Sequence, residues 1–433
     1  MAGTGDPPRR DSAIAYALAG RSSARSSSLM KSTTGIGAER DVDAHAPANI
    51  ANTTSGRRTR IACVAIAWLL VLGFVGWIAR FYHPGLGFTA LIGFPVGSEY
   101  EAPTLRQVPH YQYSGSGVYD GQFYAQRALD PLLRDPEVDH AMDLAPFRAR
   151  RILFSWTAYA AGLGRPSWIL EAYALQNVVA WLLLAALLMR WAPPQTPRGL
   201  AIWTACLFSH GMLWSVRFAL LDGPSALLTA VAVKLAEDGR AFASAVIVGI
   251  NGLARETNVI GMLAQPLPRT ARAWGRVLAA AVIAVLPLLI WEDYLRSIYR
   301  STIFAGVEGQ AGPPGLAFLG TVARTWARLR VNGLVSGTGL DACILLSVVA
   351  QAAYLLLRQR VGVTWWRVAI GYVLLMALLD RVLWDPATGA LTRVMLPMTL
   401  GFNILLLREA RPARFWGWFA LGNVHLVPAL WVL

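Results

Sequence analysis

The segment 119–131 holds the residue types in this sequence best suited to chemistry on a sugar or a phosphate. It reads Tyr-Asp-Gly-Gln-Phe-Tyr-Ala-Gln-Arg-Ala-Leu-Asp-Pro. A helix through it would place Asp120, Phe123, Tyr124 and Arg127 on one face. A carboxylate beside aromatic rings and an arginine suits a base that faces a sugar and a phosphate, because the rings stack on the sugar and the arginine pairs with the phosphate. The alternative interpretation is an interfacial helix with a capping Asp and a local ion pair.

Charged residues also interrupt the apolar stretches of the chain. Arg255 and Glu256 break one such stretch, and Asp222 and Arg393 lie near the starts of two others. Burying an ionised group in hydrocarbon costs at least ~2.5 kcal/mol, so such residues usually face the interior of a helix bundle and form pairs. Two interpretations follow: a structural pair of Arg255 with Asp222 or Glu256, and binding of a lipid phosphate.

A basic cluster formed by Arg148, Arg150 and Arg151 precedes a further apolar run. Arginine binds phosphate in bidentate fashion, so the cluster could hold an anionic ligand. Anchoring to lipid headgroups explains it equally well. The acidic pair at 292–293 ends another apolar run, and a solvated helix end is the favoured interpretation there.

Metal and redox chemistry have no support in the spacing of possible ligands. Four of the histidines (His110, His140, His210 and His425) have no metal-ligand partner at i+3 or i+4. Three widely separated cysteines, in apolar stretches, are interpreted as small core residues: Cys63, Cys206 and Cys343. No cofactor is therefore expected; a divalent metal is the alternative, without support from the spacing.

The composition requires a lipid bilayer around most of the chain. Of its 433 residues, 55% are hydrophobic and only 15% are charged, whereas a soluble domain carries about 25% charged residues. A single soluble enzyme and a disordered protein are both excluded. The net charge of +14 comes from arginines at the ends of apolar runs, where membrane topology places them, so nucleic acid is not an expected partner.

These features predict an all-α membrane protein with about eleven transmembrane helices. The predicted spans are 61–79, 152–164, 168–189, 199–216, 218–235, 241–263, 277–294, 338–357, 366–383, 391–407 and 415–433. Arginines at 57, 58 and 60 precede the first span and place the N-terminus in the cytoplasm. Three later linkers rich in arginine agree with this topology: 264–276, 358–367 and 408–414. The linker 190–198 carries two arginines on the outer side and disagrees.

The domain organisation follows from this topology. Residues 1–56 are predicted to be a disordered cytoplasmic tail, and residues 57–433 a polytopic membrane domain. The first outer loop, 80–150, is expected to be helical and extracytoplasmic, with a flexible approach at 114–117. In the second outer loop, 295–337, apolar residues recur at helical spacing with arginines between them: Leu319, Val322, Trp326 and Leu329. They predict a helix that lies on the membrane surface or packs on the outer loops.

The segment 119–131 resembles a YDGQFYxxxALDP signature of a group of bacterial multi-span membrane proteins, which look like members of the GT-C class of membrane glycosyltransferases. The resemblance covers roughly residues 60–410. Weaker similarities lie at 148–153, 221–224, 252–257 and 392–397. It implies that Asp120 is the catalytic base. The residues expected to bind substrate are Tyr119, Gln122, Tyr124, Arg127, Arg150, Arg151, Asp222, Arg255 and Arg393.

The resemblance implies transfer of a hexosyl or pentosyl group from a polyprenyl-phosphate donor to an acceptor that the sequence does not identify. Transfer would occur on the extracytoplasmic face of a bacterial plasma (inner) membrane, as part of the cell envelope. The adjacent pair of acids found in better-known relatives is absent beside Asp120. The alternative function is a polytopic transporter or flippase-like carrier without catalysis. Such carriers often contain internal repeats, and none is recognisable here. A non-catalytic scaffold is a third interpretation.

Overall fold

The structure is a computed structural model that describes residues 54–114, 119–300, 312–333, 337–384 and 389–433. Most of the predicted tail, three residues of the approach at 114–117 and parts of the second outer loop therefore lie outside the described residues. Contacts divide the chain into two units, Met1–Ile50 and Ala51–Leu433, and all described residues belong to the second.

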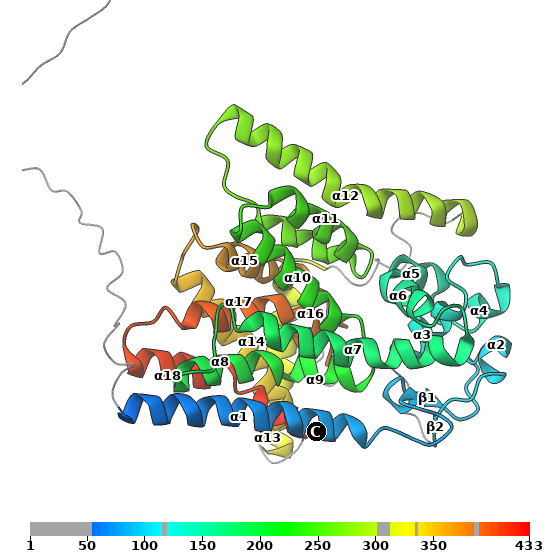
Figure 1. Ribbon diagram of the computed structural model, residues 1–433, viewed down its shortest axis with the longest axis horizontal. Helices are drawn as coiled ribbons and strands as arrows, with labels where there is room; N and C mark the ends of the chain where they lie inside the picture. The colour runs from blue at the N-terminus through cyan, green and yellow to red at the C-terminus, as the bar shows by residue number, and fades with distance from the viewer. Residues whose placement is uncertain (1–53, 115–118, 301–311, 334–336, 385–388) are drawn as a thin grey trace, which may run out of the picture. The chain divides into compact units, whose positions relative to one another are not determined.

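The described residues form an all-α membrane protein, as the sequence predicts, with one very small sheet (Figure 1). The first outer loop contains η1 (Thr89–Leu91), β1 (Phe94–Pro95), α2 (Pro103–Arg106), β2 (Gln112–Tyr113), α3 (Gly121–Leu129), α4 (Pro136–His140) and α5 (Ala145–Arg150). Strands β1 and β2 pair in parallel, with Phe94 opposite Gln112.

The rest of the chain is helical. Its helices are α1 (Thr54–Ala79), α6 (Leu153–Ala161), α7 (Pro166–Leu188), α8 (Pro197–Leu207), α9 (His210–Arg217), α10 (Asp222–Glu237), α11 (Ala241–Gly252), η2 (Glu256–Ala264), α12 (Ala271–Tyr299), α13 (Leu316–Asn332), α14 (Gly337–Leu357), α15 (Thr364–Leu378), α16 (Ala390–Val394), α17 (Leu396–Leu406), α18 (Pro412–Gly422) and α19 (Leu426–Ala429).

Four of the described helices are long and apolar enough to cross a membrane: α1, α7, α12 and α14. A fifth span results if α8 and α9, which bend by 43° at their junction, are counted together. Other predicted spans are shorter or broken; α6, for example, has nine residues, and the stretch 241–263 divides into α11 and η2. Irregular backbone at membrane depth is tolerated where it is buried in protein or lines a cavity.

The breaks coincide with the charged residues of the apolar stretches. Asp222 begins α10, Arg255 lies between α11 and η2, and Arg393 lies in the short helix α16, just before α17. All three side chains are largely buried. The helices therefore end or begin where polar side chains converge, and these ends build the candidate site.

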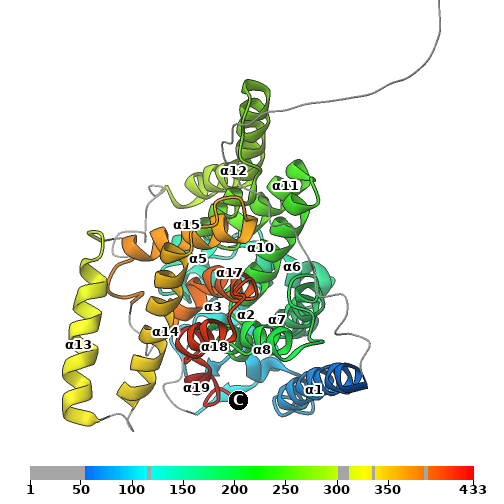
Figure 2. The same cartoon turned by 90° about the vertical axis from the view of Figure 1, so that its left-hand side faces the viewer.

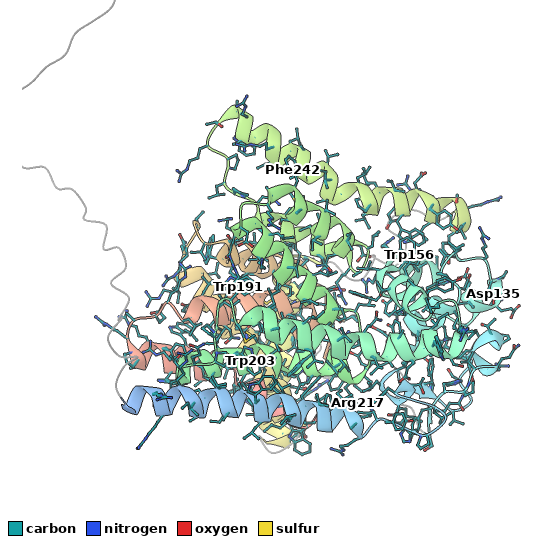
Figure 3. All side chains as sticks on the ribbon, in the orientation of Figure 1. Asp135, Trp156, Trp191, Trp203, Arg217 and Phe242 are labelled. Carbon is teal, nitrogen blue, oxygen red and sulfur yellow. The ribbon has the colours of Figure 1, made fainter. Side chains whose placement is uncertain are left out.

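Aromatic contacts fasten the long helices to their neighbours. Phe74 of α1 stacks on Trp181 of α7, with ring centroids 3.7 Å apart. Trp291 of α12 donates a hydrogen bond to the carbonyl of Ala149 at the end of α5 (3.0 Å). The same indole packs edge-on against Trp156, which Figure 3 labels beside the first-loop helices (4.8 Å). The C-terminal half of α12 thus supports the first outer loop.

Helix α13 lies beside α14 (Figure 2) rather than on the outer loops. Its small polar residues Thr321 and Thr325 are buried, whereas Leu319 and Trp326 of the predicted apolar stripe are exposed. Most of the stripe therefore faces away from the described protein, although Leu329 is half-buried. An apolar face of this kind suits contact with lipid.

Candidate functional site

A cavity of about 340 Å³ opens where the first outer loop meets the broken helices. It combines four arginines and two carboxylates with aromatic and aliphatic side chains. Its lining residues are Tyr119, Asp120, Phe123, Asp143, Phe147, Arg148, Arg151, Arg255, Val382, Leu383, Ala390, Arg393 and Val394. The cavity brings together residues up to 274 positions apart in the chain, since Arg393 donates a hydrogen bond to the hydroxyl of Tyr119 (2.7 Å).

Asp120 immediately precedes α3 but does not cap it. Its backbone is already helical, and its side chain accepts no hydrogen bond from the first turn. Instead, one carboxylate oxygen pairs with Nη2 of Arg148 at 3.0 Å, and 37% of the side chain stays exposed. The alternative interpretation of Asp120 as a capping residue is therefore wrong. The carboxylate is held from one side and open to the cavity on the other.

Arg148 is fixed by several contacts besides Asp120. Its Nε and Nη2 atoms donate to the two oxygens of Asp143, at 2.9 and 2.7 Å. The guanidinium lies over the ring of Phe123, 4.6 Å from its centroid, and also donates to the hydroxyl of Tyr124 (3.3 Å). A bidentate pair combined with ring stacking restricts the planar guanidinium to one orientation.

The charges around Asp120 decide its ionisation. Burial opposes the charged form, but the guanidinium of Arg148, assisted by Arg393 and Arg151, outweighs it and holds the pKa of Asp120 below its usual value. The carboxylate is therefore ionised at neutral pH, as a proton acceptor must be.

Asp222 organises the opposite side of the cavity. Its two oxygens pair with Arg255 at 2.8 Å and with Arg393 at 2.9 Å. This geometry confirms the predicted pair of Arg255 with Asp222. Asp222 does not line the cavity itself; it holds two arginines that do.

Glu256 pairs with the basic cluster and not with Arg255. Its carboxylate lies 3.4 Å from Arg151 and 3.6 Å from Arg150. Arg151 also lies over the ring of Phe147, 4.2 Å from the centroid, and reaches the cavity. Arg150 does not line the cavity and also forms a closer pair, at 2.6 Å, with Glu292. The interpretation of Glu292 as part of a solvated helix end is therefore wrong.

The predicted substrate-binding residues divide into three groups. Tyr119, Arg151, Arg255 and Arg393 line the cavity together with Asp120. Asp222 and Tyr124 touch residues that line it. Gln122, Arg127 and Arg150 are buried and do not line it.

Arg127 lies outside the cavity and is held by another helix of the first outer loop. Its guanidinium is buried and pairs with Asp139 of α4 at 2.6 Å. Asp120 and Arg127 do lie on one side of α3, but seven residues separate them, or about 10 Å along a helix axis. Arg127 therefore fastens α3 to α4 and does not reach the cavity that Asp120 faces.

Some lining residues carried little or no signal in the sequence. Asp143 is one acid among many in the first outer loop, and only the fold shows that it holds Arg148. Val382 and Leu383, which form an aliphatic wall of the cavity, lie at the end of a predicted span and had no sequence signal of their own. Among the described residues, no group of three or more His, Cys, Asp and Glu side chains is placed to hold a metal ion.

Comparisons with known proteins give one structural likeness. No family model matches the chain, and the search of curated proteins found no match. The crystal structure of ArnT from Cupriavidus metallidurans in the apo state is similar, with 14% sequence identity and a TM-score of 0.45. The match covers 83% of this chain and 63% of that one, so this chain spans less than two thirds of its length. The fold and the site define a helical multi-pass membrane protein with a charged cavity.

Proposed function

We propose that the protein is a membrane glycosyltransferase that moves a sugar from a polyprenyl-phosphate donor to an acceptor on the extracytoplasmic face. The observation that carries the proposal is the position of Asp120, an ionised and partly exposed carboxylate in a cavity lined by four arginines. The resemblance of the segment 119–131 to the GT-C signature gives the reaction class, and the cavity provides groups that this reaction uses.

The reaction would invert the anomeric centre in one displacement. Asp120 accepts the proton of the acceptor hydroxyl while the acceptor oxygen attacks the anomeric carbon. The bond from that carbon to the phosphate oxygen breaks, and the polyprenyl phosphate leaves with the electron pair. Arg151, Arg255 and Arg393 stabilise the phosphate charge. Because this leaving group is already a weak base, no general acid is required.

The two sides of the cavity suit the two ends of this reaction. Tyr119, which is half-buried, provides aromatic surface near Asp120, against which a sugar ring could pack. Val382, Leu383 and Val394 form an aliphatic wall near the arginines, which suits the first isoprene units of a polyprenyl chain. Binding energy from both ends would position the reacting atoms.

The decisive experiment is Asp120→Asn in purified protein reconstituted with a panel of polyprenyl-phosphate sugars. Asparagine is nearly isosteric but cannot accept the proton, so transfer should fall by ~10²–10⁴-fold with unchanged insertion and folding. The matched control is Glu137→Gln, which removes an exposed carboxylate of the same loop outside the cavity. Transfer by the Asp120→Asn protein at the control's rate would remove Asp120 from the base role.

A carrier without catalysis is the second candidate, and the bend between α8 and α9 favours it. Carriers often bind substrate where membrane helices are discontinuous, and this pair bends by 43°. A carrier would move the lipid-linked sugar across reconstituted vesicles and leave it chemically intact. Recovery of an unchanged donor on the far leaflet, with no glycosylated product from any acceptor, would support the carrier over the enzyme.

A further inference from the structure

An apolar groove runs along the middle of α1 and shares no lining residue with the charged cavity. Its volume is about 450 Å³. Side chains from α1, α7, α8 and the connection between α7 and α8 line it: Val64, Ala67, Trp68, Val71, Leu182, Ala185, Ala186, Met189, Pro193, Pro194, Gln195 and Trp203. Trp203, labelled in Figure 3, belongs to α8, the helix that packs on α1 (Figure 1).

A second hollow continues this groove toward the beginning of α1. It is lined by Arg57, Arg60, Ile61, Val64, Ala65 and Trp68. Val64 and Trp68 line both hollows, so the two form one continuous surface. Lining residues recur every three or four positions from Arg57 to Val71, which places them on one face of the helix. The surface thus changes from cationic to wholly apolar along α1.

The dimensions of this surface match one leaflet of a bilayer. Arg60 and Val71 are eleven residues apart in α1, which corresponds to about 16 Å of helix. Half of a hydrocarbon core of ~30 Å is nearly the same length. Trp68 lines the groove and is 64% exposed. An acyl chain in the groove would therefore cover apolar surface that the described protein leaves open.

We propose that this surface is a binding site for one anionic phospholipid. The headgroup phosphate lies between Arg57 and Arg60, and one acyl chain lies in the groove between α1 and α7. Arginine forms bidentate hydrogen bonds to phosphate, and two arginines together favour a headgroup with net negative charge over a zwitterionic one. The site does not depend on the proposed enzymatic function, since it shares no residue with the charged cavity.

The test is native mass spectrometry of the full chain with phosphatidylglycerol and phosphatidylcholine of identical acyl chains. The wild type should retain phosphatidylglycerol preferentially. Arg57→Gln and Arg60→Gln should each weaken its retention by about fivefold, the factor that one arginine contributes near an anionic headgroup. Arg58→Gln removes the same charge from a residue outside the groove and should leave retention unchanged.

A second pair of variants separates a fitted site from general attraction to charge. Ala186 is exposed and lines the groove, so Ala186→Phe should fill it and lose the bound phosphatidylglycerol with all arginines intact. Val179→Phe, on an exposed position of α7 outside the groove, should retain it. Equal retention of the two lipids, an Arg58→Gln loss equal to that of Arg57→Gln, or full retention by Ala186→Phe would each overturn the proposal.

Discussion

Asp120 and Asp222 are both held by arginines, but the ratio of arginines to carboxylates differs between the two groups. Arg148 is shared by two carboxylates, Asp120 and Asp143, whereas Asp222 is shared by two arginines, Arg255 and Arg393. One side of the cavity therefore carries an excess of negative charge and the other an excess of positive charge. A reaction that takes up a proton at one end and releases a phosphate at the other suits this distribution.

The pH dependence of transfer should report the contact between Asp120 and Arg148. Ionised Asp120 is required, so activity is lost as pH falls through its pKa, which Arg148 holds below the ordinary value. Arg148→Gln leaves the effect of burial opposed only by the more distant Arg393 and Arg151, so it should raise the pKa of Asp120. The acid limb of kcat/KM should move to higher pH by the same amount. Arg148→Lys keeps the charge and should move it less; an unchanged limb in Arg148→Gln would contradict the assignment.

At the level of elements, the start of α3 is fixed by close contact with its neighbours. A Cβ atom on Gly121 would lie 2.2 Å from the carbonyl oxygen of Phe218 and 3.1 Å from that of Ile92. Both are backbone atoms, which cannot rotate away as a flexible side chain can. The glycine after Asp120 therefore allows α3 to begin against the end of α9, and this contact places the carboxylate.

Gly121→Ala should accordingly move Asp120 and reduce transfer, because a displacement of about 1 Å can cost ~10²-fold in rate. The measurement is kcat in reconstituted protein, with thermal stability recorded in parallel. Gly275→Ala in α12 is the matched control, since its Cβ would meet nothing within 4 Å; there alanine should be neutral or stabilise the helix by about 0.5–1 kcal/mol. Equal rates in the two variants would show that the contact at Gly121 does not position the site.

The sequence predicted the long helices better than it predicted their breaks. An uninterrupted apolar run such as that of α1 predicts a membrane-spanning helix by its length alone. The ends of α10, α11 and α16 depend on Asp222, Arg255 and Arg393 meeting each other, and these residues are far apart in the chain. The cost of burying a charge predicts that these residues form ion pairs. It does not predict which partners they choose, because that depends on how the helices pack. Arg127 shows the same limit, because its partner Asp139 lies on a separate helix.

At the scale of the whole molecule, α12 connects the arginines at its start to the first outer loop, and the sides of the membrane on which these two regions lie decide the topology. Its 29 residues correspond to about 43 Å, more than a hydrocarbon core of ~30 Å. Arg272 lies in its first turn, and near its other end Tyr294 donates a hydrogen bond to the carbonyl of Leu132 in the first outer loop (2.7 Å). If α12 crosses the membrane, the arginines at its start and the first loop lie on opposite sides, and the positive-inside rule places the arginines in the cytoplasm.

Cysteine labelling in intact cells tests this arrangement and, with it, the extracytoplasmic position of the site. Cys343 is half-buried whereas Cys63 and Cys206 are buried, so Cys343→Ser provides a background of low reactivity. In that background, a membrane-impermeant maleimide should label Glu137→Cys in intact cells and Arg272→Cys only after permeabilisation. Both positions are exposed, so neither result depends on unfolding. Labelling of both positions from outside would show that α12 does not cross the membrane. Labelling of Arg272→Cys from outside, and of Glu137→Cys only after permeabilisation, would place Asp120 on the cytoplasmic side and contradict the proposed extracytoplasmic transfer.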